Sequence, residues 1–166
     1  MTTPLHAAAN KGNLELVRRL IDKGSDVNVI DKRGQAPLHY AAFYGHVKVI
    51  KELIANAADV NVKDYYGYTP LHYAANYGYV EVVKELIING ADVNVRNNRG
   101  NTPLHDAVYN EHIDVVRELL NNDAYIDDEN DKGQTPLDIA LKKDYTEIVK
   151  LLEEFNQVDI KEPEFD

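Results

Sequence analysis

The feature that most constrains the fold is a four-residue word that returns every 33 residues along the chain. Its five occurrences are Thr3-Pro4-Leu5-His6, Ala36-Pro37-Leu38-His39, Thr69-Pro70-Leu71-His72, Thr102-Pro103-Leu104-His105 and Thr135-Pro136-Leu137-Asp138. Self-similarity at a fixed period of this length is the signature of a solenoid, in which each repeat buries its core against its neighbours. The sequence therefore predicts one domain built from stacked repeats.

Each word predicts the start of a helix. Thr69 can accept a backbone N–H as the N-cap residue, and Pro70 suits the next position, where a missing N–H costs nothing. Ala74 and Ala75 then give the helix a small face that lets a second helix approach closely. Gly78 stands where a left-handed cap would end it. We expect a short helix in every repeat.

A second helix in each repeat is predicted from apolar residues that return at the same offsets. In the third repeat these residues are Val80, Val82, Val83, Leu86 and Ile87. This spacing is typical of an amphipathic helix whose apolar face packs on the rest of the repeat. A turn rich in Asp, Asn and Gly precedes each word from the second repeat on, with the sequences Asp31-Lys32-Arg33-Gly34, Asp64-Tyr65-Tyr66-Gly67, Asn97-Asn98-Arg99-Gly100 and Asn130-Asp131-Lys132-Gly133.

The Thr-Pro-Leu-His-x-Ala words at this period resemble the ankyrin repeat family. The resemblance covers nearly everything from Thr3 to about Phe155. It implies an all-α solenoid of helix-turn-helix units with connecting β-hairpin-like loops. We place the repeat domain at residues 1–155 and its units at about 1–30, 31–63, 64–96, 97–129 and 130–155. Residues 156–166 form an acidic tail that we expect to be disordered.

Three residues break the repeating glycine pattern. Ala57 and Asp123 occupy the loop position of Gly24 and Gly90, and Glu111 takes the place of the glycine that ends the first helix. If the backbone is left-handed there, Ala57 is strained, and Ala57→Gly is predicted to stabilise the protein.

Composition narrows the class of protein. Residues 1–100 carry 12 Lys and Arg against 10 Asp and Glu, whereas residues 101–166 carry 6 against 18, so the net negative charge lies in the C-terminal third. There is no cysteine, which excludes disulfides and thiol chemistry. The sequence shows neither a signal peptide nor the roughly 20 apolar residues that a membrane span needs. We expect a monomer in the cytoplasm, without a membrane association.

The four aligned histidines, His6, His39, His72 and His105, raise the possibility of a metal site. Consecutive repeats stack about 8 to 10 Å apart, whereas the nitrogen ligands of one zinc ion each lie about 2.0 to 2.1 Å from it. The histidines are therefore predicted to hydrogen-bond backbone near the turns. The acidic run that ends at Gly133 fails as a calcium loop, because Lys132 would fall at position 5.

An enzyme is not indicated, and the residues imply no cofactor. The only serine is Ser25, and no Ser-His-Asp or Cys-His set can be proposed. Resemblance to the family also raises hydroxylation of the loop asparagines Asn28, Asn61 and Asn94, which we expect instead to shape the loops. His46 and His112, and likewise Tyr79 and Tyr145, are expected at the surface.

A binding surface can be predicted from the variable positions of the turns and first helices, which the family uses to grip other proteins. These positions are Lys32, Arg33, Gln35, Phe43, Tyr44, Lys63, Tyr65, Tyr66, Tyr68, Asn76, Tyr77, Arg96, Asn98, Arg99, Asn101, Tyr109 and Asn110. We call this set the predicted binding surface. Tyr and Arg are enriched at binding hot spots, and a stable repeat has no structural need for tyrosine at turn tips.

The sequence is compatible with three functions. The first is a protein-binding adaptor, scaffold or inhibitor that grips an acidic and apolar partner with a concave face rich in Tyr and Arg. The second is single-stranded nucleic-acid binding by the same strip, against which the acidic C-terminal third argues. The third is an engineered or purely structural scaffold, against which the irregular fourth unit argues.

Overall fold

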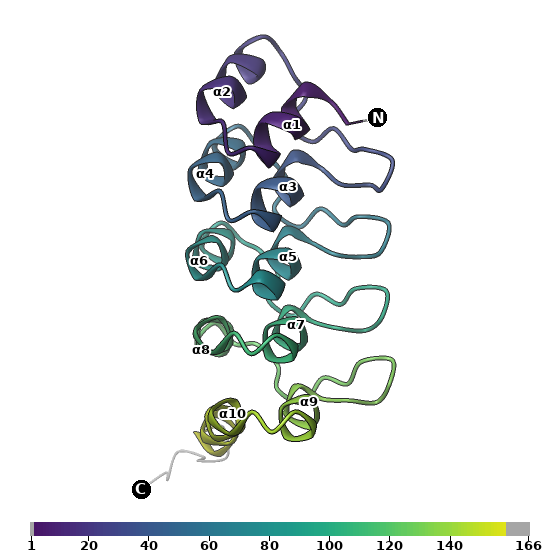
Figure 1. Ribbon diagram of the computed structural model, residues 1–166, viewed down its shortest axis with the longest axis vertical. Helices are drawn as coiled ribbons and strands as arrows, with labels where there is room; N and C mark the ends of the chain where they lie inside the picture. The colour runs from purple at the N-terminus through teal and green to yellow at the C-terminus, as the bar shows by residue number, and fades with distance from the viewer. Residues whose placement is uncertain (1, 159–166) are drawn as a thin grey trace, which may run out of the picture.

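The protein is a stack of helix pairs (Figure 1). The computed structural model describes residues 2–158, which contain ten helices and no strand. Figure 1 shows the odd-numbered helices in an inner column, between the even-numbered helices and the long loops. The all-α solenoid prediction is confirmed. The helices are α1 (Pro4–Asn10), α2 (Leu14–Asp22), α3 (Pro37–Phe43), α4 (Val47–Ala55), α5 (Pro70–Tyr77), α6 (Val80–Ile88), α7 (Pro103–Tyr109), α8 (Ile113–Leu120), α9 (Pro136–Lys142) and α10 (Thr146–Val158).

The inner helices begin where the repeated words predict. The hydroxyl of Thr69 accepts the backbone N–H of His72, three residues on, and Pro70 is the first helical residue. Ala36 has no hydroxyl, so α3 begins with only half of this arrangement: the ring of His39 accepts the Ala36 N–H at 3.0 Å. One helix cap is thus missing in the second repeat.

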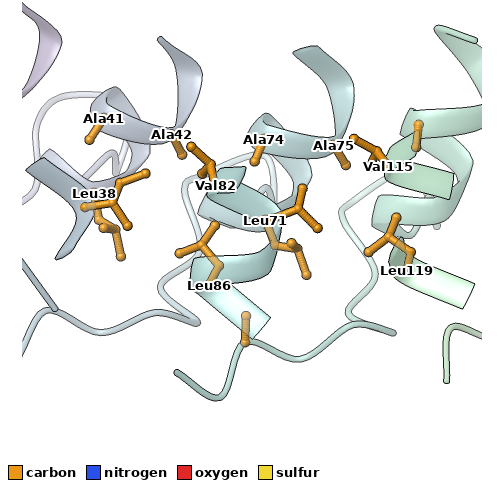
Figure 2. Close-up of a cluster of buried hydrophobic side chains, with 14 of the residues drawn as sticks. Leu38, Ala41, Ala42, Leu71, Ala74, Ala75, Val82, Leu86, Val115 and Leu119 are labelled. Atoms are coloured by element: carbon orange, nitrogen blue, oxygen red, sulfur yellow. The ribbon is translucent and has the colours of Figure 1, made fainter. Parts of the chain in front are cut away.

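The core is a continuous row of small and branched side chains between repeats. Figure 2 shows Ala41, Ala42, Ala74 and Ala75 on the inner helices, with valine and leucine side chains of the outer helices between and below them. Each of these four alanines is fully buried. Because alanine adds little volume, the helices approach closely and every repeat shares its core with the next.

The left-handed positions lie where the glycine pattern predicts. Gly24 and Gly90 both have φ of 88°, and Ala57 has φ of 65° at the same loop position. Glu111 and Asp123, with φ of 59° and 62°, are left-handed as well. The premise that Ala57 is strained is therefore confirmed.

Helix α10 continues three residues past the domain boundary that we expected at residue 155. It reaches Val158, so residues 156–158 belong to the last helix rather than to a tail. The rest of the expected acidic tail, residues 159–166, lies outside the described residues.

The residue before each of the outer helices α4, α6 and α8 packs on the preceding repeat. The Nε2 atom of His46 donates to the carbonyl of Asn10 at 2.9 Å, and that of His112 donates to the carbonyl of Asn76 at 3.0 Å. Both rings are only half exposed, as is Tyr79. The expectation that these side chains are ordinary surface residues is wrong, because each one covers a glycine that ends the inner helix one repeat earlier.

Candidate functional site

The aligned histidines connect neighbouring repeats. The Nδ1 atom of His72 accepts the N–H of Thr69 at 3.2 Å, and its Nε2 donates to the carbonyl of Asn101 in the next repeat at 3.0 Å. The same Nε2 bond to a carbonyl 29 residues on recurs at His6, His39 and His105. Both ring nitrogens therefore have hydrogen-bond partners, which confirms the prediction that these histidines bond to backbone near the turns.

Burial favours the neutral form of His39, His72 and His105. Desolvation lowers the pKa of His72 to about 4, although the backbone bond to Asn101 opposes it. Burial likewise lowers the pKa of His39 and His105. In residues 2–158, no three His, Cys, Asp or Glu side chains are grouped so that they could hold a metal ion.

The loop tips form a hydrogen-bonded ladder along the stack. In the third repeat, Asp64 accepts the backbone N–H groups of Tyr66 and Tyr68 at 2.9 Å, which closes the turn. The N–H of Tyr65 donates to the carbonyl of Arg33, and the carbonyl of Tyr66 accepts from the next tip, each at 3.0 Å. The tips are thus rigid, because backbone bonds hold each one to its turn and to its neighbours.

Two tyrosines project from this rigid ladder. Tyr65 and Tyr66 are 62% and 63% exposed. The charged tip residues Lys32, Arg33 and Arg99 are exposed beside them. Tyr68 differs, because it is half-buried with its ring centre 5.4 Å from that of His72 and 5.5 Å from that of Tyr73. Tyr68, which the predicted binding surface groups with Tyr65 and Tyr66, therefore packs within the stack instead of projecting from it.

Several polar members of the predicted binding surface bond to neighbouring backbone. Lys63 donates to the carbonyl of Arg96 at 3.2 Å, and Arg96 donates to that of Glu129 at 2.6 Å. The Asn98 side chain donates to the carbonyl of Tyr65 at 3.0 Å. These contacts join consecutive tips and reduce the number of basic groups that are free to meet a partner.

Aromatic side chains also gather at the C-terminal ends of the inner helices. The ring of Phe43 lies 4.7 Å from Tyr44 and 4.5 Å from Tyr77, measured between centres, and 5.7 Å from Tyr73. Tyr44 and Tyr77 are 47% and 42% exposed, whereas Phe43 is half-buried. Phe43 therefore supports an exposed aromatic pair, and a cavity of about 180 Å³ lies beside it near Arg33.

The remaining members of the predicted binding surface are half-buried amides and one tyrosine. Gln35 donates to the Tyr73 hydroxyl at 2.7 Å, and Asn110 donates to Asn76 at 2.9 Å. Asn101 accepts from Asn130 at 3.0 Å. Tyr109 is 56% exposed, and the ammonium of Lys143 lies 4.0 Å above its ring centre. The amides mainly connect repeats.

The structure adds a cavity that the sequence analysis did not identify. It has a volume of about 770 Å³ and lies between the fourth and fifth repeats, with Tyr68 and Asn76 of the third repeat also on its wall. Tyr68, Arg99 and Tyr109 of the predicted binding surface line it, but so does Asp106, and the fifth repeat adds its own group: Asn130, Asp131, Lys132, Gln134, Ile139, Lys142 and Lys143. The signal was present in the sequence, since Asp106 stands where the two preceding repeats have Tyr40 and Tyr73.

The loss of that tyrosine changes the local chemistry. The hydroxyl groups of Tyr40 and Tyr73 donate to the turn aspartates Asp31 and Asp64, both at 2.8 Å. At position 106 a short carboxylate replaces the phenol and is only 5% exposed. Desolvation raises the pKa of Asp106 to about 7, with partial opposition from nearby Asn101 and Arg99.

The comparisons with known proteins agree with this architecture. The family model of ankyrin repeats in three copies matches residues 5–97 and 71–162. No curated protein matches the sequence. The chain belongs to the ankyrin repeat family, whose members are in general protein–protein interaction modules and typically non-catalytic. None of the helices in the described part of the chain combines the length and apolar character of a membrane span.

Proposed function

We propose that this protein is a non-catalytic interaction module that grips a partner protein with the Tyr- and Arg-rich face of repeats two to four. The observation that carries the proposal is the exposure of Tyr65 and Tyr66, at 62% and 63%, on a backbone fixed by bonds to both neighbouring tips. A rigid aromatic side chain contributes contact area at a low cost in conformational entropy. The Tyr65 ring lies against Gly34 of the preceding tip, but most of its surface and that of Tyr66 stay exposed.

The charges around these tyrosines favour a partner with acidic groups beside an apolar anchor. Lys32, Arg33 and Arg99 are exposed near the tips and would set the approach and register of the partner. The exposed pair Tyr44 and Tyr77 extends the apolar part of the surface along the inner helices. Because Lys63 and Arg96 bond to backbone, the basic strip is too sparse to favour a nucleic-acid ligand.

The test is a pull-down from a lysate of the source cell with the intact protein and with the double variant Tyr65→Ser and Tyr66→Ser. Tyr68 is left unchanged because its ring packs on His72. The matched control is Tyr125→Ser, which removes a ring of equal exposure, 61%, from a loop outside the predicted binding surface.

Proteins captured by the intact chain and the Tyr125 control but lost with the double variant would support the proposal. Circular dichroism must show the same helix content and midpoint of unfolding for all three proteins. Equal capture by the double variant would refute this site.

A further inference from the structure

The cavity between the fourth and fifth repeats contains one unsatisfied acceptor. Asp106 lines this cavity, and its Oδ2 atom is buried without a hydrogen-bond partner among the described residues, as is the Nδ2 donor of Asn97. Its neighbours on the cavity wall differ: His105 bonds to Thr102 and Gln134, and Asn101 accepts from Asn130. A buried acceptor without a donor is costly, so a ligand that brings a donor gains from this site.

The walls of the cavity suit a flat cation. Tyr68 and Tyr109 both line it, and Lys143 already places its ammonium 4.0 Å above the Tyr109 ring centre. A guanidinium group stacks on aromatic rings and presents several N–H donors in one plane. Hydrogen bonds from such a group to an ionised carboxylate are charge-assisted and stronger than neutral ones, and Asp106, with a pKa raised to about 7 by burial, is ionised above neutral pH. The volume of about 770 Å³ falls in the range of ligand pockets, roughly 300 to 1,000 Å³.

The charged residues around the cavity favour a bound cation that has acidic neighbours. Arg99, Lys132 and Lys142 are exposed at the rim, where solvent screens their repulsion of a guanidinium group. The same three cations would attract carboxylates on either side of the inserted group. The cavity is thus complementary to a basic side chain in an acidic segment, which agrees with the acidic partner inferred from the loop tips.

We propose that this cavity binds one arginine side chain of the partner, with its guanidinium donating to Asp106 and acidic neighbours of that arginine lying against Lys132 and Lys142. The inference rests on the proposed function, because it names a side chain that the partner presents. It also extends the contact surface into the fifth repeat.

The test uses two short probes and no partner. Acetyl-Glu-Arg-Glu-amide carries the proposed group, and acetyl-Glu-citrulline-Glu-amide replaces the guanidinium by a neutral urea of the same shape. Each is titrated into the full chain while the backbone amide signals of Asn101 and Asp106 are followed by NMR. The protein variants are Asp106→Asn and, as a control, Asp131→Asn, which removes an exposed carboxylate from the same cavity.

We expect the arginine probe to saturate these signals, with a dissociation constant at least tenfold lower than that of the citrulline probe. Asp106→Asn should remove this preference, and Asp131→Asn should change the constant less than twofold. Equal binding of the two probes, unchanged binding to Asp106→Asn, or no binding at all would overturn the arginine site. None of these three results would affect the pull-down test of Tyr65 and Tyr66, so failure of the cavity and failure of the proposed function are distinguishable.

Discussion

Asp106 should make the stability of the protein depend on pH in a direction unusual for a carboxylate. Its pKa in the folded protein is raised to about 7, from 3.8, because burial disfavours the charged form. The unfolded chain releases this proton near pH 4, whereas the folded protein keeps it until about pH 7. The contribution of Asp106 to the free energy of unfolding is therefore largest below pH 4, falls as the pH rises from 4 to about 7, and is constant above that.

The perturbation is Asp106→Asn, which keeps the shape of the side chain and removes its ionisation. One pKa unit corresponds to about 1.4 kcal/mol, so the interval from 3.8 to about 7 sets an upper bound of about 4 kcal/mol. Between pH 5 and pH 7 alone, the free energy of unfolding of the variant should rise relative to the wild type by about 2 to 3 kcal/mol. Above pH 7.5 the difference should stay level.

The assay is urea unfolding followed by circular dichroism at half-unit steps from pH 5 to pH 8.5, for the wild type and both Asn variants. Arg99, Asn101 and Tyr68 lie near Asp106, and all are present in each protein. Their contributions cancel in the difference between the curves. Asp131→Asn should shift stability by less than about 0.5 kcal/mol, because its carboxylate is exposed. A difference between wild type and Asp106→Asn that does not change with pH would refute the reasoning, since the carboxyl would then ionise normally in the folded protein.

Three further stability predictions follow from the caps and the histidines. Ala57→Gly should raise the free energy of unfolding, measured in urea, by about 0.5 to 1 kcal/mol, because the left-handed backbone suits glycine. Gly90→Ala should lower the free energy of unfolding for the same reason. A lower free energy of unfolding for Ala57→Gly would contradict the strain at this position. Ala36→Thr should raise the free energy of unfolding by about 1 kcal/mol, because it restores the hydroxyl cap of α3. In urea unfolding, the midpoint should rise while the m-value stays the same. His72→Gln should lower the free energy of unfolding by about 2 to 4 kcal/mol at pH 7. This loss should shrink as the pH falls from 6.5 towards 4, because the depressed pKa of His72 means that its stabilising contribution disappears in acid. A loss that does not depend on pH would show that the ring is not held neutral.

Most of the fold could be predicted from the sequence because its determinants are local. The Thr-Pro word starts a helix through a hydroxyl three residues from its partner, and the left-handed positions depend on the backbone of single residues. Repetition at 33 residues then implies that each unit meets its neighbour in the same way. Even the strain at Ala57 was visible, because Gly24 and Gly90 mark the same position in other repeats.

The candidate site was less predictable because its state depends on contacts between repeats. Lys63, Arg96 and Asn98 were grouped with free surface residues, but each donates to a carbonyl 33 residues away. Tyr68 lies two residues after Tyr66, yet its ring turns into the stack. Which side chains stay free is decided by the rotamers that adjacent repeats permit, and a list of variable positions does not contain that information.

The solenoid, the starts of its inner helices and the structural role of the aligned histidines could be predicted from the sequence alone, because each depends on contacts between residues close in the chain that are repeated every 33 residues. Which tyrosine rings are exposed and where the cavity forms depend on packing between repeats, which the sequence does not show. The difference at position 106 was readable as an aspartate in place of a tyrosine, but its consequence required the fifth repeat. Asp106 becomes a buried acceptor without a donor because a short carboxylate replaces the tyrosine whose hydroxyl bonds to the turn aspartate in the preceding repeats, so that its Oδ2 and the Nδ2 of Asn97 both lack a partner among the described residues.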